Sequence, residues 1–190
     1  MPTISIIYFS GAGHTAKLAE AVSKGAASIA GVNANLIAIQ GSDIASGRYH
    51  NDNVLAQLDA SDAIIFGSPT YMGGPAGQFK CFADATVPAW RIAGWRDKIA
   101  AGFTVSNSPS GDKLSTLQYF FTLAMQHGMI WVGLGELPHQ ANGINAVGSF
   151  SGAMALAGRE PVDVKPDEND KLTGEVLGRR VARLVLKMAK

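Results

Sequence analysis

A run of small and hydroxyl-bearing residues near the N-terminus could bind a phosphate group. The run is Ser10-Gly11-Ala12-Gly13-His14-Thr15, and it directly follows an apolar stretch. Ser10 and Thr15 offer hydroxyls, and the glycines leave the neighbouring backbone amides unhindered. Helical periodicity begins just beyond the run, so free amides and the positive end of a helix dipole would face the same ligand. We therefore predict an anion site that needs no lysine.

Two better-known phosphate motifs fit this run less well. The stretch from Gly11 to Ala16 matches Gly-x-Gly-x-x-Ala, the dinucleotide fingerprint, but that motif also expects an acidic residue about 20 positions later. Residues 31–42 contain none, and Asp43 is the first to follow them. A P-loop would end in Lys-Ser or Lys-Thr, whereas His14-Thr15 stands here. A phosphate monoester remains as the ligand, and an empty glycine-rich turn is the alternative.

Two further loops of similar composition follow later apolar runs. Residues 68–75 come after the run 62–67, and Ser106-Asn107-Ser108-Pro109-Ser110-Gly111-Asp112 comes after the run 99–105. Ligands of open parallel sheets bind outside the carboxyl ends of the strands. We therefore expect all three loops to meet at one edge of a sheet.

Short apolar runs alternate along the chain with stretches of helical periodicity, which is typical of a parallel sheet covered by helices on both faces. The sequence predicts five strands, at residues 3–9, 35–39, 62–67, 99–105 and 129–134. Helices are expected after the first strand, after the polar stretch 40–53, and at residues 76–86, 114–125 and 170–189. Residues 135–158 are glycine-rich, and we expect them to be irregular and to contribute to function.

Size and charge narrow the classes of function. A chain of 190 residues, of which 47% are hydrophobic, suits one globular domain at residues 1–190. Its net charge of +1 gives no broad basic surface for nucleic acid, and it lacks the acidity of carriers that steer toward redox partners by negative charge. The sequence contains no basic leader and no apolar run of membrane-spanning length. We predict a cytoplasmic protein without a membrane span.

Neither a metal site nor a serine nucleophile is predicted. The four histidines, His14, His50, His127 and His139, have no metal-like spacing with carboxylates. The loop 106–110 lacks the Gly-x-Ser-x-Gly pattern of a nucleophile elbow.

The three loops, in this order and spacing, resemble the flavodoxin superfamily and, within it, the tryptophan-repressor-binding-protein-like NAD(P)H:quinone oxidoreductases. The resemblance covers most of the chain and includes Tyr8-Phe9-Ser10, Gly13-His14-Thr15, residues 62–70, residues 77–84, Trp90, His127-Gly128-Met129 and the terminal helix. It implies an α/β, flavodoxin-like three-layer sandwich, in which a five-stranded parallel sheet of order 2-1-3-4-5 carries helices on both faces. It also implies an FMN-dependent enzyme that transfers hydride from NAD(P)H to a quinone or a similar small acceptor.

The resemblance assigns each loop a role. The first loop, Ser10 to Thr15, would hold the FMN phosphate. Beside the isoalloxazine ring would lie Pro69, Thr70, Tyr71, Met72 and Gly73, among which Tyr71 and Met72 offer an apolar surface. The other edge of the flavin would be wrapped by Ser106, Asn107, Ser108, Pro109, Ser110, Gly111 and Asp112. His127 would face the flavin as the catalytic side chain, and Trp90 would help to bind the quinone.

Three parts of the chain depart from the family pattern. The second loop has Tyr71-Met72 and Gly74 where the best-known members carry a basic-aromatic pair and an asparagine. Asn107, Pro109 and Ser110 stand where the family is richer in glycine, so the third loop is expected to follow a different path. Residues 135–158, which should cover the open flavin face, are shorter and diverge as well. The resemblance therefore says less about the choice of substrate than about the fold and the cofactor.

Other interpretations remain open at this stage. His127, just before Gly128, is also suited to interact with exposed carbonyls at a helix end, and Trp90 is suited to ordinary packing. A flavodoxin-like electron carrier or a non-catalytic FMN-binding module could keep the same loops. The resemblance also implies a homodimer or homotetramer in which a neighbouring subunit completes the active site, and exposed rings at Trp90 and Trp95 would fit such an interface.

Overall fold

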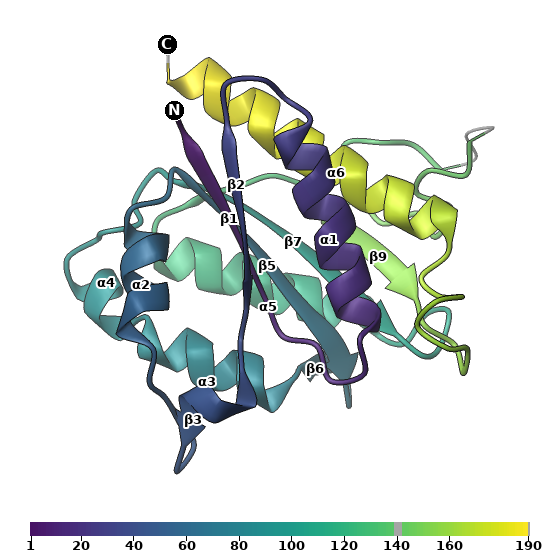
Figure 1. Cartoon of the computed structure of the whole chain (residues 1–190), viewed down its shortest axis with the longest axis horizontal. Coiled ribbons are helices and arrows are strands. Elements are labelled where there is room, and N and C mark those ends of the chain that lie inside the picture. Colours follow the sequence, from purple (N-terminus) through teal and green to yellow (C-terminus); the bar gives the residue numbers. More distant parts are fainter. Residues whose placement is uncertain (139–141, 190) are drawn as a thin grey trace.

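A parallel β-sheet forms the centre of the computed structural model, which describes residues 1–138 and 142–189 (Figure 1). Its four long strands are β1 (Thr3–Tyr8), β2 (Asn33–Ala38), β5 (Ala63–Tyr71) and β7 (Ile99–Ser106). They lie in the order β2-β1-β5-β7, and every neighbouring pair is parallel. Strands β5 and β7 are buried almost throughout, as expected for central strands with both faces covered. The predicted flavodoxin-like fold is confirmed.

The fifth position of the sheet is shared by two short strands. Strands β8 (Ile130–Trp131) and β9 (Ala153–Leu156) pair with successive parts of β7, at Ile99–Ala100 and at Phe103–Ser106. The prediction of one continuous strand at residues 129–134 is therefore wrong, and so is the prediction that residues 135–158 are irregular throughout. After the Val132 amide bonds the Ala100 carbonyl of β7, the Leu134 amide donates instead to the Phe150 carbonyl, 3.0 Å away, within the intervening segment 132–152.

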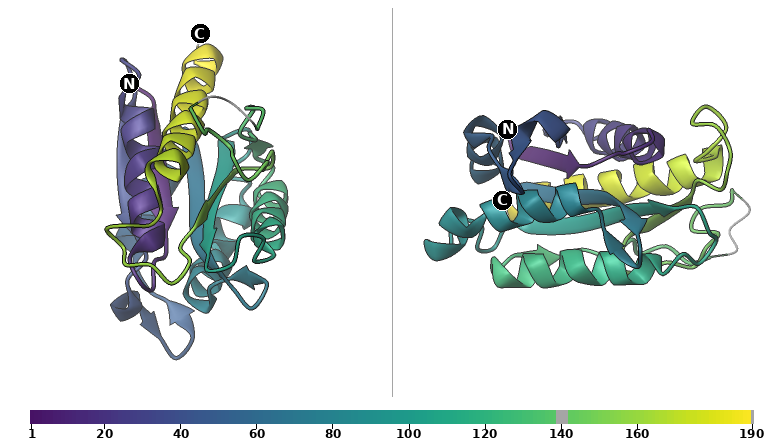
Figure 2. Two further views of the ribbon diagram at one scale, coloured as in Figure 1. Left: turned by 90° about the vertical axis from the view of Figure 1, so that its right-hand side faces the viewer. Right: turned by 90° about the horizontal axis from the view of Figure 1, so that it is seen from below.

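Helices cover both faces of the sheet and make three layers (Figure 2). Helices α1 (His14–Ala27) and α6 (Glu168–Met188) pack on one face, around the buried Ile4, Ile6 and Phe103. Helices α2 (Asp52–Asp59), α3 (Gly77–Ala85) and α5 (Lys113–Gln126) pack on the other, and the short α4 (Val87–Arg91) follows α3. Each helix on the second face therefore runs back from the carboxyl edge of the sheet toward its amino edge.

The connections contain small elements that the sequence does not predict. The polar stretch 40–53 forms the 3-10 turn η1 (Gly41–Asp43) and an antiparallel pair, β3 (Ile44–Ala45) with β4 (Arg48–Tyr49). Strand β6 (Gly74–Pro75) folds back antiparallel onto the end of β5. This hairpin holds the loop after β5 at the sheet edge.

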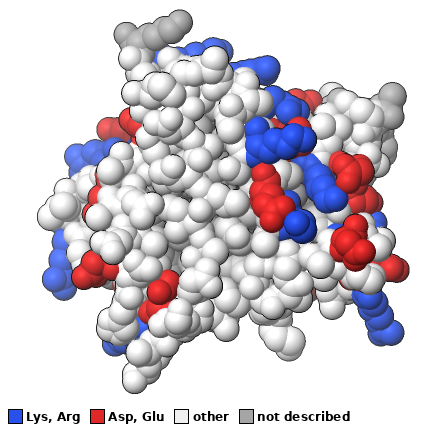
Figure 3. Space-filling model, viewed as in Figure 1, with Lys and Arg blue, Asp and Glu red and all other residues white. Residues whose placement is uncertain are grey.

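Helices α1 and α6 approach each other closely. A side chain at Gly25 would collide with the backbone of Glu175, and one at Gly178 with the backbone of Val22. Charges of both signs are interspersed over these two helices (Figure 3), and Lys24 pairs with Glu175 across them at 2.7 Å. Within the described residues, no helix is both long enough and apolar enough to cross a membrane.

Candidate functional site

A cavity of about 440 Å³ lies where the loops after β1, β5 and β7 meet. This is the carboxyl edge of the parallel strands, where open α/β sheets bind their ligands, and the volume suits a small-molecule site. From the three predicted loops, the lining residues are Gly11, Ala12, His14, Thr15, Pro69, Thr70, Tyr71, Met72, Gly73, Ser106, Asn107, Ser108 and Gly111. The three loops thus form one site, and none of the described residues that line it carries a carboxylate.

The first loop presents free amides at the start of α1. The Ser10 hydroxyl accepts hydrogen bonds from the amides of Gly13 at 3.1 Å and Ala16 at 3.2 Å. No described residue accepts a bond from the amides of His14 and Thr15, which begin the helix. The first turn contains no acidic residue, so nothing there opposes an anion. Ser10 and Gly13 do not line the cavity; they shape the loop that does.

The second loop combines a rigid base with an exposed apolar tip. The buried Thr70 hydroxyl lies 2.8 Å from the hydroxyls of both Thr104 and Thr116, which ties the end of β5 to β7 and α5. Beyond it, Tyr71 is 48% exposed and Met72 is fully exposed. A methyl group added at Gly11 would lie 2.5 Å from the Tyr71 hydroxyl, so this ring borders the phosphate loop. The tip therefore offers a flat apolar surface beside the anion site.

The third loop is held by a side chain that sequence reasoning missed. Lys113, the first residue of α5, donates from Nζ to the Ser106 hydroxyl and to the carbonyls of Ser108 and Pro109. Burial lowers the pKa of this ammonium, and the negative charge of Asp170 partly offsets the shift. The predicted residues Pro109, Ser110 and Asp112 do not line the cavity. The sequence signal for Lys113 is its position, directly after Asp112, at the start of a long stretch without charged residues.

Two other lining residues lie outside the predicted loops. Val105 is the residue before the third loop, and Ala157 follows β9. Nearby on α6, the Asp170 carboxylate accepts a 2.9 Å hydrogen bond from the Leu156 amide. Burial raises the pKa of Asp170 to about 6. The segment that interrupts the fifth strand thus returns to the cavity at Ala157, and its functional role stays a prediction.

His127 and Trp90 lie at the opposite edge of the sheet. Helix α5 starts at the cavity and runs for 14 residues, about 21 Å, before it reaches His127. That imidazole is buried and stacks on the fully buried Trp95 at 4.3 Å, so Trp95 presents no exposed ring for an interface. Trp90, on α4, is 49% exposed. Neither His127 nor Trp90 lines the cavity of its own chain.

The tautomer of His127 follows from its one partner. The Thr86 hydroxyl donates to the Ala83 carbonyl at 2.7 Å, so it accepts from Nε2 of His127, 2.8 Å away. Nδ1 is buried and has no hydrogen-bond partner among the described residues. Burial lowers the pKa of His127, and Asp59 partly offsets this. The ring is therefore a neutral donor at Nε2 whose second nitrogen remains free to accept.

Comparison with protein families shows to which family of proteins the chain belongs. A family model described as NADPH-dependent FMN reductase matches residues 4–141. The chain belongs to this family. The NADPH-dependent FMN reductase family uses FMN as cofactor and a nicotinamide as electron donor, so the chain is an FMN-dependent NAD(P)H oxidoreductase.

Individual relatives include both enzymes and carriers by name. "Flavodoxin FldP" of Pseudomonas aeruginosa is 38% identical, over 94% of each chain. An "NAD(P)H dehydrogenase (quinone)" of Syntrophobacter fumaroxidans is 31% identical, over 98% of each. The solved structure of a flavodoxin, WrbA-like protein from Agrobacterium tumefaciens is 41% identical, with a TM-score of 0.78, and covers 98% of this chain and 99% of its own.

The cavity fits the cofactor of the FMN reductase family. Free amides at the start of α1 suit the phosphate, and the apolar tip at Tyr71 and Met72 suits a flavin ring. Donors and acceptors of the third loop border the same space. The described residues contain no group of three side chains able to hold a metal ion; His139 lies outside them.

Proposed function

We propose that this chain, working as one unit over residues 1–190, reduces quinone-type acceptors with electrons from NAD(P)H through FMN held in the three-loop cavity. One observation carries the proposal: the three loops join into a single cavity free of carboxylates, with an amide-rich helix start at one end and an exposed aromatic tip at the other. FMN, when bound, accepts a hydride and passes two electrons on. A cytoplasmic location, where NAD(P)H is available, belongs to the same proposal.

The chain's own residues bind and orient the cofactor. We assign the phosphate to the amides of His14 and Thr15, which have no acceptor among the described residues. We assign the flavin ring to the tip formed by Tyr71 and Met72. Covering apolar side chains with the ring removes apolar surface from water, which is favourable. The backbone at Met72 and Gly73 is left-handed, with φ of 48° and 76°. It makes a tight turn in the loop that we place beside the ring.

A quinone is the proposed acceptor for two reasons. Several relatives of about 30% identity that cover nearly the whole chain carry the name NAD(P)H dehydrogenase (quinone). The tip of the second loop is also open, since Met72 is fully exposed, so a planar acceptor can stack where the nicotinamide has left. A hydride acceptor of this shape needs no side-chain nucleophile.

A single-electron carrier is the second candidate. The 38% identity to a protein named flavodoxin is the observation that favours it. The two functions differ in a measurable way, because a carrier keeps a stable one-electron-reduced flavin and reacts slowly with nicotinamides.

The decisive experiment is anaerobic absorbance spectroscopy of the FMN-loaded protein. We expect NADH or NADPH to bleach the flavin absorbance band. Addition of a benzoquinone should restore the band, and the cycle should repeat over many turnovers. Reduction without turnover, through a stable one-electron form, would favour the carrier. If FMN does not bind at all, the assignment of the three loops is wrong.

We also propose a homodimer or homotetramer in which a neighbouring subunit brings the exposed Trp90 to the flavin, with His127 buried against Trp95 behind that surface. Within one chain these residues lie about one helix length from the cavity, so the roles that sequence resemblance implies require a second subunit. The outer side of α5 supports an interface: Leu114, Phe121 and Met125 are each more than 40% exposed, and residues 114–135 include no Asp, Glu, Lys or Arg. A water-facing helix seldom lacks charge.

Subunit mixing tests this arrangement. Gly13→Val should abolish FMN binding, and Trp90→Ala should impair turnover with FMN still bound. When the two inactive variants are unfolded and reassembled together, mixed dimers would contain one complete site, and activity should return to about a quarter of wild type by random pairing. If the mixture is shown to contain mixed oligomers and its activity does not recover, Trp90 lies outside the site.

A further inference from the structure

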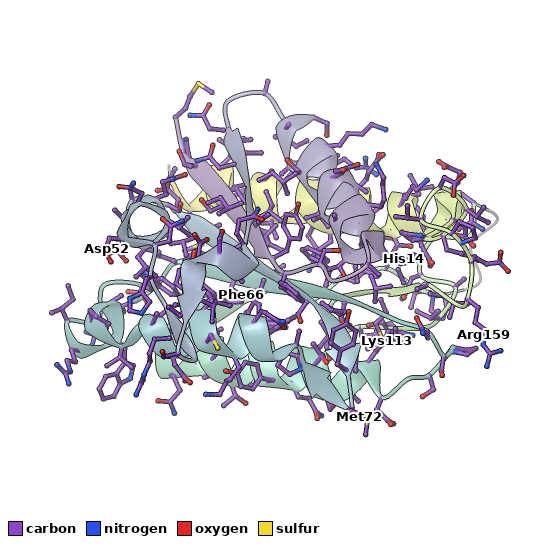
Figure 4. All side chains as sticks on the ribbon, turned by 60° about the horizontal axis from the view of Figure 1, so that its bottom comes forward. His14, Asp52, Phe66, Met72, Lys113 and Arg159 are labelled. Carbon is purple, nitrogen blue, oxygen red and sulfur yellow. The ribbon has the colours of Figure 1, made fainter. Side chains whose placement is uncertain are left out.

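The third loop rests on a buried ammonium group. Lys113 is only 1% exposed, and its Nζ lies 2.8 Å from the Ser106 hydroxyl, 3.1 Å from the Ser108 carbonyl and 2.8 Å from the Pro109 carbonyl. Ser106 and Ser108 line the cavity. One side chain therefore fixes the wall of the site from behind (Figure 4), on the same side of the molecule as His14 and Met72.

The geometry requires this nitrogen to be charged. The two carbonyls can only accept, and the Ser106 hydroxyl donates to the Ser108 carbonyl at 2.9 Å, so it accepts from Nζ. Lysine can donate three hydrogen bonds only as an ammonium ion. All three donors are thus engaged by uncharged groups.

No carboxylate neutralises this charge directly. Among residues 1–138 and 142–189, Lys113 forms no ion pair within 4.0 Å, and Asp170 acts on it only from a longer distance. A buried charge without a partner is costly. Its field is screened less than that of a surface charge, because Lys113 is only 1% exposed.

We propose that Lys113 is a positioning residue that stabilises reduced FMN over oxidised FMN. This inference rests on the proposed function. A hydride delivers two electrons and one proton, so the cofactor gains one negative charge when it is reduced. Lys113 holds the loop of Ser106 and Ser108 against the cofactor, and its positive charge behind that loop attracts the added negative charge. Hydride transfer into the site is thereby favoured.

The expected size of the effect follows from Coulomb's law. A unit charge at about 10 Å, with an effective dielectric constant of about 20, changes the ratio of reduced to oxidised binding at least tenfold. For a two-electron couple, tenfold corresponds to about 30 mV. Loss of the charge should lower the midpoint potential of bound FMN by about that amount or more.

The test compares Lys113→Met with Lys98→Met in the FMN-loaded protein. Lys98 is a matched control, because its Nζ also donates to two carbonyls, those of Leu58 and Asp59, and burial lowers its pKa as well, but it precedes β7 at the far edge of the sheet. Anaerobic titration against a reference dye gives each potential. We expect Lys113→Met to lower the midpoint potential of bound FMN by about 30 mV or more. Lys98→Met should leave that potential unchanged. Lys113→Arg, which keeps the positive charge, should keep the potential near the wild-type value.

Other results separate this inference from the proposed function. An unchanged potential in Lys113→Met, or an equal shift in Lys98→Met, overturns the role of Lys113. If the wild-type protein fails to bind FMN, the proposed function fails first. Should Lys113→Met not fold, Lys113→Gln, which still donates to the loop but carries no charge, provides the same measurement with the same expected direction.

Discussion

Replacing Ser10 with alanine separates two roles that a serine in a phosphate loop can have. Its hydroxyl accepts from the Gly13 and Ala16 amides at 3.1 and 3.2 Å, and these two donors have no other acceptor in the described chain. Loss of such a cap costs about 0.5–2 kcal/mol. With two amides affected, we expect the FMN-free protein to lose about 1–2 kcal/mol of unfolding free energy.

FMN binding should weaken by a similar free energy, because the cofactor must then order the loop. A loss of about 1–2 kcal/mol corresponds to a roughly 5- to 30-fold increase in Kd. Urea unfolding of the FMN-free protein measures the first quantity, and quenching of flavin fluorescence on titration measures the second. Ser28→Ala is the matched control, since that hydroxyl bonds the Gly25 carbonyl at the other end of α1; it should leave FMN binding unchanged.

The two measurements together can refute the reasoning. If Ser10→Ala weakens FMN binding while the FMN-free protein keeps its full stability, Ser10 binds the phosphate directly and does not shape the loop. If neither quantity changes, the loop does not depend on its hydroxyl at all.

Three further changes have defined outcomes. Gly13→Ala should cost about 1–3 kcal/mol of unfolding free energy, because φ is +93° and the new methyl would lie 2.9 Å from Val162; Gly41→Ala, with nothing within 4 Å, is its control in the same urea assay. Thr70→Val should cost about 1–3 kcal/mol, since two buried hydroxyls lose a partner, and Thr122→Val on the exposed face of α5 should cost far less. Burial raises the pKa of Asp170 to about 6, above its value in the unfolded chain. The protonated carboxyl therefore stabilises the folded state below about pH 4, and this contribution is lost as the pH rises through about 6. The loss in unfolding free energy is up to about 3 kcal/mol. Urea unfolding between pH 4 and pH 7 should show this decrease in the wild type and not in Asp170→Asn, and parallel curves would contradict the assignment.

The sequence predicted the loops of the site well because their chemistry is local. Glycine, serine and threonine at the ends of apolar runs determine both the turns and the groups that the turns present. Thirteen of the lining residues lie in the three loops that this pattern predicts. Ser10 and Gly13 do not line the cavity, and the Ser10 hydroxyl is used by hydrogen bonds within the loop, so their contact with the ligand stays a prediction.

Features that depend on distant parts of the chain were not predictable in this way. The pairing of both β8 and β9 with β7 joins segments far apart in sequence, and periodicity over residues 129–134 does not reveal where the chain leaves the sheet. Lys113 is buried because the third loop closes over it, and a terminal lysine on a helix is usually exposed. The distance of His127 from the cavity follows from the direction of α5 along the sheet.

The division of the sheet edge between β8 and β9 also bears on how such proteins diversify. Both strands are anchored to β7, so the segment between them starts and ends at fixed points of the scaffold, and its return delivers Ala157 to the cavity wall. Changes in the length or sequence of this excursion leave the pairing of the four long strands untouched. This part of the cavity wall can therefore vary while the pairing that holds the remainder of the site is retained.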